Sequence, residues 1–273
     1  MIDIHCHILP GLDDGPESLG EALDMSRAAA TDGVKVIVAA PHFKPGAYEF
    51  TGPGILESIN TLEVALKNAG IDIRIVPGAE VTVSPEMPKY LKQQRHLTIN
   101  SNGRYFLAEF SPHSVPANWD TFLLSLLRSG LAPIIAHPER NFWFMHHPEA
   151  LAAAVQSGIL VQITAMSITG AFGVAARDFS AYLLRHNLVH AIASDGHCAD
   201  FRPPRLAEAV GLAADIIGPE RANALVTSIP QAIIEGQDIP VPEPFKYYAC
   251  GREQKRSWFQ RASSFLPRIG VSG

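Results

Sequence analysis

Seven short apolar segments alternate with amphipathic ones along the chain, and this alternation restricts the fold more than any other feature. The apolar segments are rich in β-branched residues, as buried strands are. Glycine often stands between an amphipathic segment and the next apolar one, so the helix-to-strand connections are short. The pattern predicts strands at 1–5, 34–39, 71–76, 105–110, 131–136, 159–164 and 188–193.

The amphipathic segments have helical periodicity and predict an outer layer of helices. Repeated strand–helix units favour a parallel sheet. Seven of them favour a closed α/β barrel, with an open doubly wound sheet as the alternative. The motifs GxGxxG and GxxxxGK[ST] do not occur, which weakens the nucleotide-binding forms of the open sheet. The predicted helices are 17–31, 54–69, 119–129, 148–157, 174–186, 206–217, 219–227 and 230–235.

Length and composition favour one barrel-sized domain followed by a tail. The 273 residues are 47% hydrophobic, and a proline-rich stretch at 239–244 separates a barrel over 1–240 from a basic, aromatic tail over 241–273. The tail is predicted to be a helix packed on the barrel or a frayed terminus. As an amphipathic segment it would instead make peripheral contact with an acidic membrane or with a partner.

The charge and the N-terminus exclude several other classes of protein. A formal net charge of -5 gives no case for nucleic-acid binding. No signal-like segment precedes the first predicted strand, and no apolar run approaches the roughly 20 residues of a membrane span. Three cysteines cannot form a disulfide framework. We therefore expect a cytoplasmic protein.

Histidine, aspartate and glutamate residues follow the apolar segments, where the strands of a barrel end. His5 and His7 are two residues apart on a strand, so both side chains point to the same side. Asp195 and His197 repeat this spacing after the last strand. For His5 and His7 alone, two hydrogen-bonded polar residues are an equally good interpretation. For Asp13 and Asp14, a plain acidic turn is an equally good interpretation. Because the carboxyl ends of barrel strands share one face, the full set predicts one polynuclear metal centre. The candidate ligands are His5, His7, Asp14, His42, Glu80, Glu109, His137, Asp195 and His197.

Nine ligands, some of them bridging, are enough for two or three divalent ions. Imidazole together with carboxylate suits manganese, zinc or iron. Such centres activate water and hold the attacking and leaving oxygens in phosphoryl transfer. Arg140 and Arg205 follow ligand segments, and guanidinium groups bind phosphate in a bidentate manner. A surface ion pair is the usual role of either arginine alone, but their position beside the ligand loops favours a role in substrate binding, more so for Arg140.

These motifs resemble those of the PHP (polymerase and histidinol phosphatase) superfamily, and more narrowly the CpsB-type bacterial tyrosine phosphatases of capsule and exopolysaccharide operons. The resemblance covers roughly residues 1–240 and implies a distorted (βα)7 barrel with a trinuclear site, most often manganese. It rests on IDIHCHILPGLDDG at 2–15, APH at 40–42, GAE at 78–80, EF at 109–110, HPER at 137–140 and SDGH at 194–197.

Carried over by position, the resemblance assigns each candidate ligand to an ion and gives Arg140 and Arg205 the phosphate group. His5, His7, Glu80 and Asp195 would hold the first ion, Glu80, Glu109 and His137 the second, and Asp14, His42 and His197 the third. The family often has a second histidine where this chain has Phe43. Phe43 or Tyr48 could therefore stack on an aromatic substrate ring.

The resemblance implies hydrolysis of phosphotyrosine by metal-activated water. The expected substrate is a phosphotyrosine protein, in particular a bacterial tyrosine kinase that controls polysaccharide synthesis. A small-molecule phosphatase of the histidinol-phosphate phosphatase kind is the alternative enzyme. A non-catalytic regulatory protein that keeps the metal site is the alternative of another class. The residues do not decide the native metal, the phosphoprotein or the oligomeric state.

Overall fold

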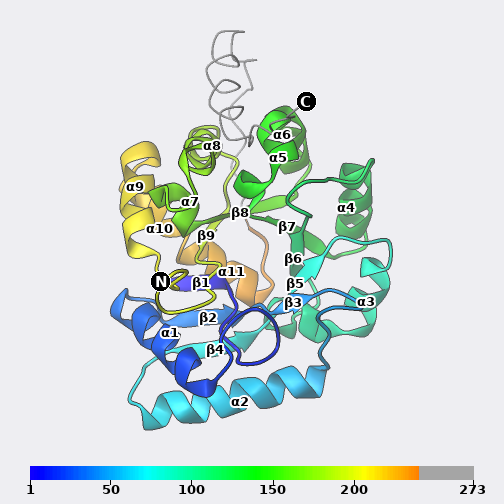
Figure 1. Cartoon of the computed structure of the whole chain (residues 1–273). Helices are drawn as coiled ribbons and strands as arrows, with labels where there is room; N and C mark the ends of the chain where they lie inside the picture. The colour runs from blue at the N-terminus through cyan, green and yellow to red at the C-terminus, as the bar shows by residue number, and fades with distance from the viewer. Residues whose placement is uncertain (240–273) are drawn as a thin grey trace, which may run out of the picture.

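The strands stand in the middle of the molecule and the helices surround them (Figure 1). The structure is a computed structural model, and it describes residues 1–239. The predicted tail over 241–273 lies outside the described residues. The strands are β1 Ile2–Cys6, β2 Val36–Ala39, β3 His42–Phe43, β4 Arg74–Pro77, β5 Glu80–Thr82, β6 Tyr105–Glu109, β7 Ala132–Ala136, β8 Leu160–Thr164 and β9 Ala191–Ala193.

All seven predicted strands are confirmed, with ends that differ by at most three residues. The short strands β3 and β5 were not predicted, because proline and glycine interrupt the apolar pattern just before them. Each continues the course of the strand before it. Gly78, in the interruption between β4 and β5, lies so close to β2 that a Cβ atom there would be 2.6 Å from Cγ1 of Val38.

The strands form two all-parallel sheets, in the orders β1-β2-β4 and β3-β5-β6-β7-β8-β9. Because β2 leads into β3 and β4 into β5, the two sheets follow one another around the molecule. The first strand, β1, and the segment after the last strand, β9, are joined by backbone hydrogen bonds. The backbone N–H of Asp195 donates to the carbonyl of His5 at 2.8 Å, and that of His7 donates to the carbonyl of Gly196 at 2.9 Å. This arrangement agrees with the predicted seven-stranded barrel.

Two apolar clusters lie on opposite sides of the strands, as the two-residue period requires. The inner cluster includes Ile4, Val38, Leu107 and Ile134, and Ile233 of the last helix joins it. The outer cluster fills the space between the strands and the surrounding helices. In β6, for example, Leu107 belongs to the inner cluster and Phe106 to the outer one. The strand interior is therefore a packed core, and polar chemistry is restricted to the strand ends.

All eight predicted helices are present, with ends that differ by at most three residues. Ser18 and Thr51 cap the first two by accepting backbone N–H groups of Glu21 and Gly54. The short helices α3, α5 and α7 were not predicted. The helices are α1 Leu19–Thr31, α2 Gly52–Asn68, α3 Met87–Gln93, α4 Trp119–Arg128, α5 Phe142–His146, α6 Pro148–Gln156, α7 Ala165–Thr169, α8 Val174–Arg185, α9 Ala207–Ile217, α10 Pro219–Ala224 and α11 Ser228–Glu235, with 3-10 turns η1 Arg95–Leu97, η2 Ile99–Ser101 and η3 Pro138–Arg140.

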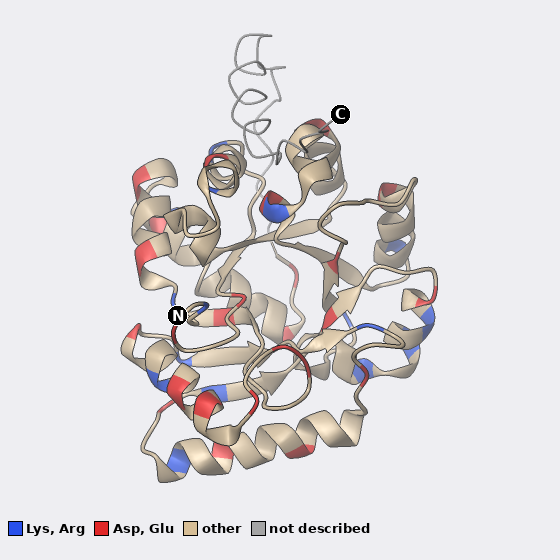
Figure 2. Ribbon diagram, in the orientation of Figure 1, with Lys and Arg blue, Asp and Glu red and all other residues tan. Residues whose placement is uncertain are grey.

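The charged positions are unevenly spread over this scaffold. Acidic positions occur along the central strands and their loops and also on the outer helices, where α2 has one lysine beside two glutamates and α3 has two lysines (Figure 2). Within residues 1–239, no helix is both long and apolar enough to span a bilayer.

Candidate metal centre

The nine predicted ligands lie together at the carboxyl ends of the strands and the loops that follow. Every one of them has an imidazole nitrogen or carboxylate oxygen within 3.7 Å of another member of the set. β1 and the residue after it provide two histidines, β3 and β5 provide His42 and Glu80, and β6 ends on Glu109. The other four lie in the loops after β1, β7 and β9.

The deepest donors surround Glu80, which is fully buried at the start of β5. Its Oε2 atom lies 3.4 Å from Nε2 of His5 and 3.5 Å from Nε2 of His7. Asp195 faces the same two nitrogens through Oδ1, at 3.6 and 3.4 Å. Oε2 of Glu80 is buried and has no hydrogen-bond partner among the described residues. Four donor atoms thus converge from two histidines and two carboxylates.

The outer nitrogens of these two rings are held by polar side chains. Nδ1 of His5 lies 3.0 Å from Oε1 of Gln162, and Nδ1 of His7 lies 2.6 Å from Oδ2 of Asp13. An acceptor at Nδ1 places the ring proton there and leaves the lone pair on Nε2. The two Nε2 atoms then face each other at 3.3 Å with lone pairs on both. A cation between them fits this arrangement, because neither neutral ring has a proton to share.

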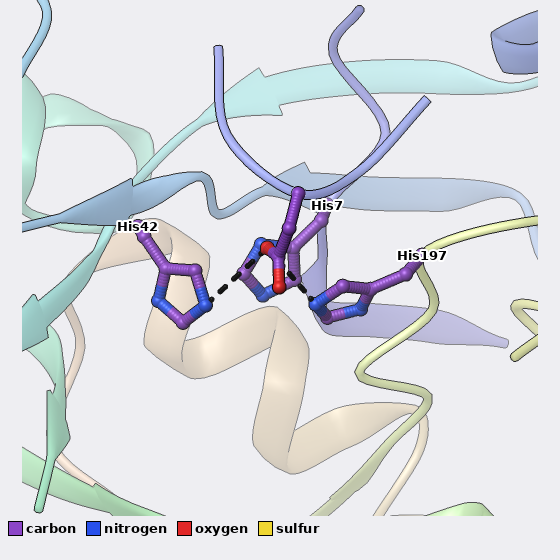
Figure 3. A group of neighbouring side chains, drawn as sticks. His7, His42 and His197 are labelled. Carbon is purple, nitrogen blue, oxygen red and sulfur yellow. Dashed lines mark ion pairs between the residues drawn. The ribbon is translucent and has the colours of Figure 1, made fainter. Parts of the chain in front are cut away.

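Asp14, His42 and His197 form a second group of donors, together with His7 (Figure 3). Oδ1 of Asp14 lies 3.5 Å from Nε2 of His42 and 3.4 Å from Nε2 of His197. Nδ1 of His197 donates to the carbonyl of Asp195 at 2.9 Å, so Nε2 of the neutral ring is an acceptor that faces a carboxylate. These donors lie within 4.8 Å of one another, as a bound ion requires.

His42, Glu80 and Glu109 form a third group, and His137 adjoins it. Nδ1 of His42 lies 3.0 Å from Oε2 of Glu80 and 3.6 Å from Oε2 of Glu109. Nε2 of His137 lies 2.7 Å from Oε1 of Glu80. Glu80 therefore contacts histidines in every part of the cluster. A carboxylate with both oxygens engaged is suited to bridge two ions.

The pKa values of the cluster follow from burial and mutual charge. Burial lowers the pKa of His5, but Glu80 and Asp195 outweigh it and the net pKa is raised. Burial raises the pKa of Glu80, and His5 and His137 outweigh it, so the net pKa lies well below its usual value. Burial and the neighbouring Glu80 raise the pKa of Glu109. Carboxylates and imidazoles thus stabilise each other's charged forms, and a metal ion would replace the imidazole protons.

His137 and Asp195 have left-handed backbones, with φ of 34° and 51°. This conformation costs a residue with a Cβ atom on the order of 1 kcal/mol or more. His137 directly follows β7, and Asp195 lies two residues after β9. The turn at each position directs the side chain into the cluster. The strain thus falls on two donors of the cluster.

Two arginines approach Asp195 from the loops after β7 and β9. Nη1 of Arg140 donates to Oδ2 of Asp195, as does Nη2 of Arg202 at 2.7 Å. Arg202 was not predicted. Arg205 was predicted to bind the phosphate group. Its side chain is exposed, and its role stays a prediction. The guanidinium groups of Arg140 and Arg202 also lie over the ring of Phe172, at 4.6 and 5.7 Å from its centroid.

Supporting residues were also missed by the sequence analysis. Asp13 was considered only together with Asp14, as a pair that reaches the metal site or forms a plain acidic turn. Gln162 was not considered, because an amide inside an apolar strand carries no motif. Its position within the buried strand β8 was the available signal. Asp3 is fully buried and accepts hydrogen bonds from the hydroxyl and the backbone N–H of Ser194. Burial raises its pKa to about 6. It ties β1 to the segment that carries Asp195.

Removing the carboxylate partner of His7 should weaken metal binding while the fold is kept. Asp13 accepts from the backbone N–H groups of Gly15 and His42 and contacts His7. Partners that orient a ligand typically contribute about 10–100-fold in affinity. We expect Asp13→Ala to lose about that much, measured by competition with a chelating dye. Asp24→Ala, on exposed α1, is the control, and equal affinities in the two variants would contradict the assignment.

The affinity for metal should fall as the pH falls. The loss should begin at a higher pH than it would in a site whose histidines have ordinary pKa values. Imidazole must be deprotonated to bind a metal. The pKa values of His5 and His7 are raised by their carboxylate neighbours, so their protons compete with the ion at higher pH. Titrations between pH of about 8 and about 6 should show a progressive loss of affinity. An affinity independent of pH in this range would contradict deprotonation of these rings on metal binding.

The fold and the site define a class of protein: a parallel α/β barrel with a cluster of imidazole and carboxylate donors at the carboxyl ends of its strands. The chain belongs to the CpsB/CapC family of capsular polysaccharide synthesis, whose model matches residues 1–235.

Two named proteins are similar in sequence to this chain over nearly their whole length. The tyrosine-protein phosphatase YwqE of Bacillus subtilis is 34% identical over 248 residues, which are 90% of this chain and 97% of the relative. The tyrosine-protein phosphatase CpsB of Streptococcus agalactiae is 32% identical over 244 residues, 88% of this chain and 100% of the relative.

Solved structures agree with the fold. A chain from the crystal structures of YwqE from Bacillus subtilis and CpsB from Streptococcus pneumoniae, described as metal-dependent tyrosine phosphatases, superposes with a TM-score of 0.85 at 34% identity. It covers 90% of this chain and 100% of that chain. A β-aspartyl dipeptidase from Fervidobacterium islandicum superposes with a TM-score of 0.51 at 16% identity, covering 89% of this chain and 75% of that one, which is a likeness of fold alone.

Proposed function

We propose that this protein is a metal-dependent protein-tyrosine phosphatase. The observation that carries the proposal is the joint presence of nine metal donors and two arginines at one barrel mouth. The donors suit two or three divalent ions, and the arginines suit a phosphate group. The family membership and the relatives named as tyrosine-protein phosphatases support the same activity.

We infer that each group of donors holds one ion, with manganese as the preferred metal and zinc or iron as alternatives. When bound, such ions activate water for attack on phosphorus and stabilise the charge of the leaving oxygen. The converging lone pairs around Glu80 and the carboxylate opposite His197 support this loading. His5, His7, Glu80 and Asp195 would hold one ion, Glu80, Glu109 and His137 a second, and Asp14, His42 and His197 a third.

The protein's own residues would bind and orient the phosphoester. The side chains of Arg140 and Arg202 are 30% and 26% exposed, so both stay partly accessible beside Asp195. Each has five N–H donors and uses only some of them on Asp195. The remaining N–H groups would donate to phosphate oxygens and stabilise charge in the transition state. Charge attraction would draw a dianionic phosphate to this pair.

An aromatic side chain beside the cluster supports an aromatic phosphoester as substrate. The ring of Tyr48 stacks on His42 at 5.7 Å between centroids, with an interplanar angle of 19°. Tyr48 is partly exposed, whereas Phe43 is 2% exposed and belongs to the core. Of the two residues named from the sequence, these contacts therefore favour Tyr48 as the ring that would stack on a phosphotyrosine side chain.

We further infer that the substrate is a phosphotyrosine protein of polysaccharide synthesis, in particular a bacterial tyrosine kinase, and that the enzyme acts in the cytoplasm. The capsular polysaccharide family supports the pathway.

A substrate panel tests the proposed activity. The manganese-loaded protein would be assayed for phosphate release from a phosphotyrosine peptide, a phosphoserine peptide and histidinol phosphate. We expect the phosphotyrosine peptide to have the highest kcat/KM. Preference for histidinol phosphate would keep the metal site and reject the substrate. No release from any of the three would favour a regulatory protein that retains the site.

A further inference from the structure

One aromatic ring connects the two arginines that approach Asp195. Arg140 lies in η3 after β7, and Arg202 lies in the loop after β9. Phe172 comes from a third loop, between α7 and α8. The Cζ atoms of the two arginines lie 4.6 and 5.7 Å from the centroid of its ring. Three loops thus meet at one phenyl group beside the metal donors.

The two guanidinium groups need a fixed environment because like charges so close together repel each other. Asp195 binds both, but it is also a donor of the metal cluster, with Oδ1 toward His5 and His7. The negative face of a phenyl ring attracts cations within about 6 Å of its centroid. Phe172 therefore offers the arginines a cation–π interaction with a neutral ring, which does not occupy a metal-binding carboxylate.

Phe172 is itself firmly held. Its side chain is partly buried and packs against the outer apolar cluster. Gly170 and Gly173, with φ of 87° and 92°, form the turn around it, and the N–H of Gly173 donates to the carbonyl of Gly170 at 2.9 Å. The ring thus sits in a defined turn that is anchored to the barrel.

We propose that Phe172 is a positioning residue that holds Arg140 and Arg202 in the geometry that binds the phosphate group of the substrate. This inference rests on the proposed function. The inference adds to the proposed function a residue that aligns the two phosphate-binding arginines without itself touching metal or substrate. Its effect on turnover would arise through the arginines, and not through loss of metal or of fold.

Two substitutions separate the attraction of the ring from simple packing. Phe172→Leu keeps an apolar side chain of similar bulk but has no aromatic face, while Phe172→Tyr keeps the face. Binding of inorganic phosphate to the manganese-loaded protein would be measured by calorimetry, and kcat/KM with p-nitrophenyl phosphate. Metal content and melting temperature would be measured for each variant. The Nε–H resonances of Arg140 and Arg202 would be recorded in metal-free protein, because a ring beneath them shifts them upfield.

For Phe172→Leu we expect about tenfold weaker phosphate binding and a similar fall in kcat/KM, since two cation–π contacts are lost. The upfield arginine shifts should disappear, with metal content and melting temperature unchanged. Phe172→Tyr should stay near the wild type in all five measurements. In an Arg140→Ala, Arg202→Ala background, Phe172→Leu should have no further effect on phosphate binding.

Three results would overturn the inference: wild-type phosphate binding in Phe172→Leu, an equal loss in Phe172→Tyr, or a loss of metal or stability that accounts for the effect. The outcome is separable from that of the proposed function. A wild-type protein that binds phosphate but releases none from any phosphoester would reject the phosphatase activity, and the phosphate titrations and arginine resonances would still decide the role of Phe172.

Discussion

Replacing Glu80 by alanine should abolish phosphate release and remove bound metal from the protein. Glu80 is fully buried, and its two carboxylate oxygens contact His5, His7, His42 and His137 at 2.7–3.5 Å. No other residue of the cluster contacts so many histidines. Metal ions supply several kcal/mol of transition-state stabilisation, so we expect kcat/KM with a phosphotyrosine peptide to fall by about 10³-fold or more.

The Glu80 variant needs a metal analysis and a matched control. Glu57→Ala removes a glutamate from the exposed face of α2 and should leave metal content and turnover unchanged. Mass spectrometry of the dialysed proteins would give the number of ions in each. Circular dichroism would show whether the Glu80 variant keeps its fold. Full metal content and wild-type turnover in a folded Glu80→Ala protein would show that the bridging role is misassigned.

Removal of Arg202 should lower turnover by about 10²-fold or more while the metal content stays constant. Its guanidinium group donates to the carboxylate and the carbonyl of Asp195, and its side chain is partly exposed. Loss of one preorganised group that stabilises transition-state charge typically costs this much in kcat. Arg140→Ala should behave in the same way, because Arg140 binds the same carboxylate.

Arg205→Ala is the informative comparison for Arg202. Both arginines follow His197 in the same loop, and the side chain of Arg205 is exposed. If Arg202 holds the phosphate, Arg205→Ala should stay within a few-fold of the wild type. The reverse result, with a large loss in Arg205→Ala and little loss in Arg202→Ala, would favour the assignment made from the sequence. Loss of metal in either variant would point to a structural role.

The strand order and the ligand set were predictable because both follow local rules. A buried parallel strand is an apolar run, and only a strong functional reason places histidine or carboxylate at its end. This rule found His5, Glu80 and Glu109, and the structure brings them together with the other predicted ligands. The strands β3 and β5 were missed because Pro41 and Gly78 interrupt the pattern while the chain keeps its direction.

Contacts between loops could not be predicted, because they depend on the three-dimensional course of each loop and not on its local sequence. Arg202 and Arg205 have the same local context, and only the course of the loop separates the one that reaches Asp195. Gln162 supports His5 across 157 residues of sequence. Phe172 resembles any apolar residue in a turn, and its relation to two arginines appears only in three dimensions.

The most direct test is phosphate release from a phosphotyrosine peptide by the purified protein, first stripped with a chelator and then resupplied with manganese. The stripped protein should release no phosphate, and manganese should restore release in proportion to the ions bound, up to two or three per chain. Undiminished release by protein shown to be free of metal would contradict the account, because the donors around Glu80 would then have no part in the reaction.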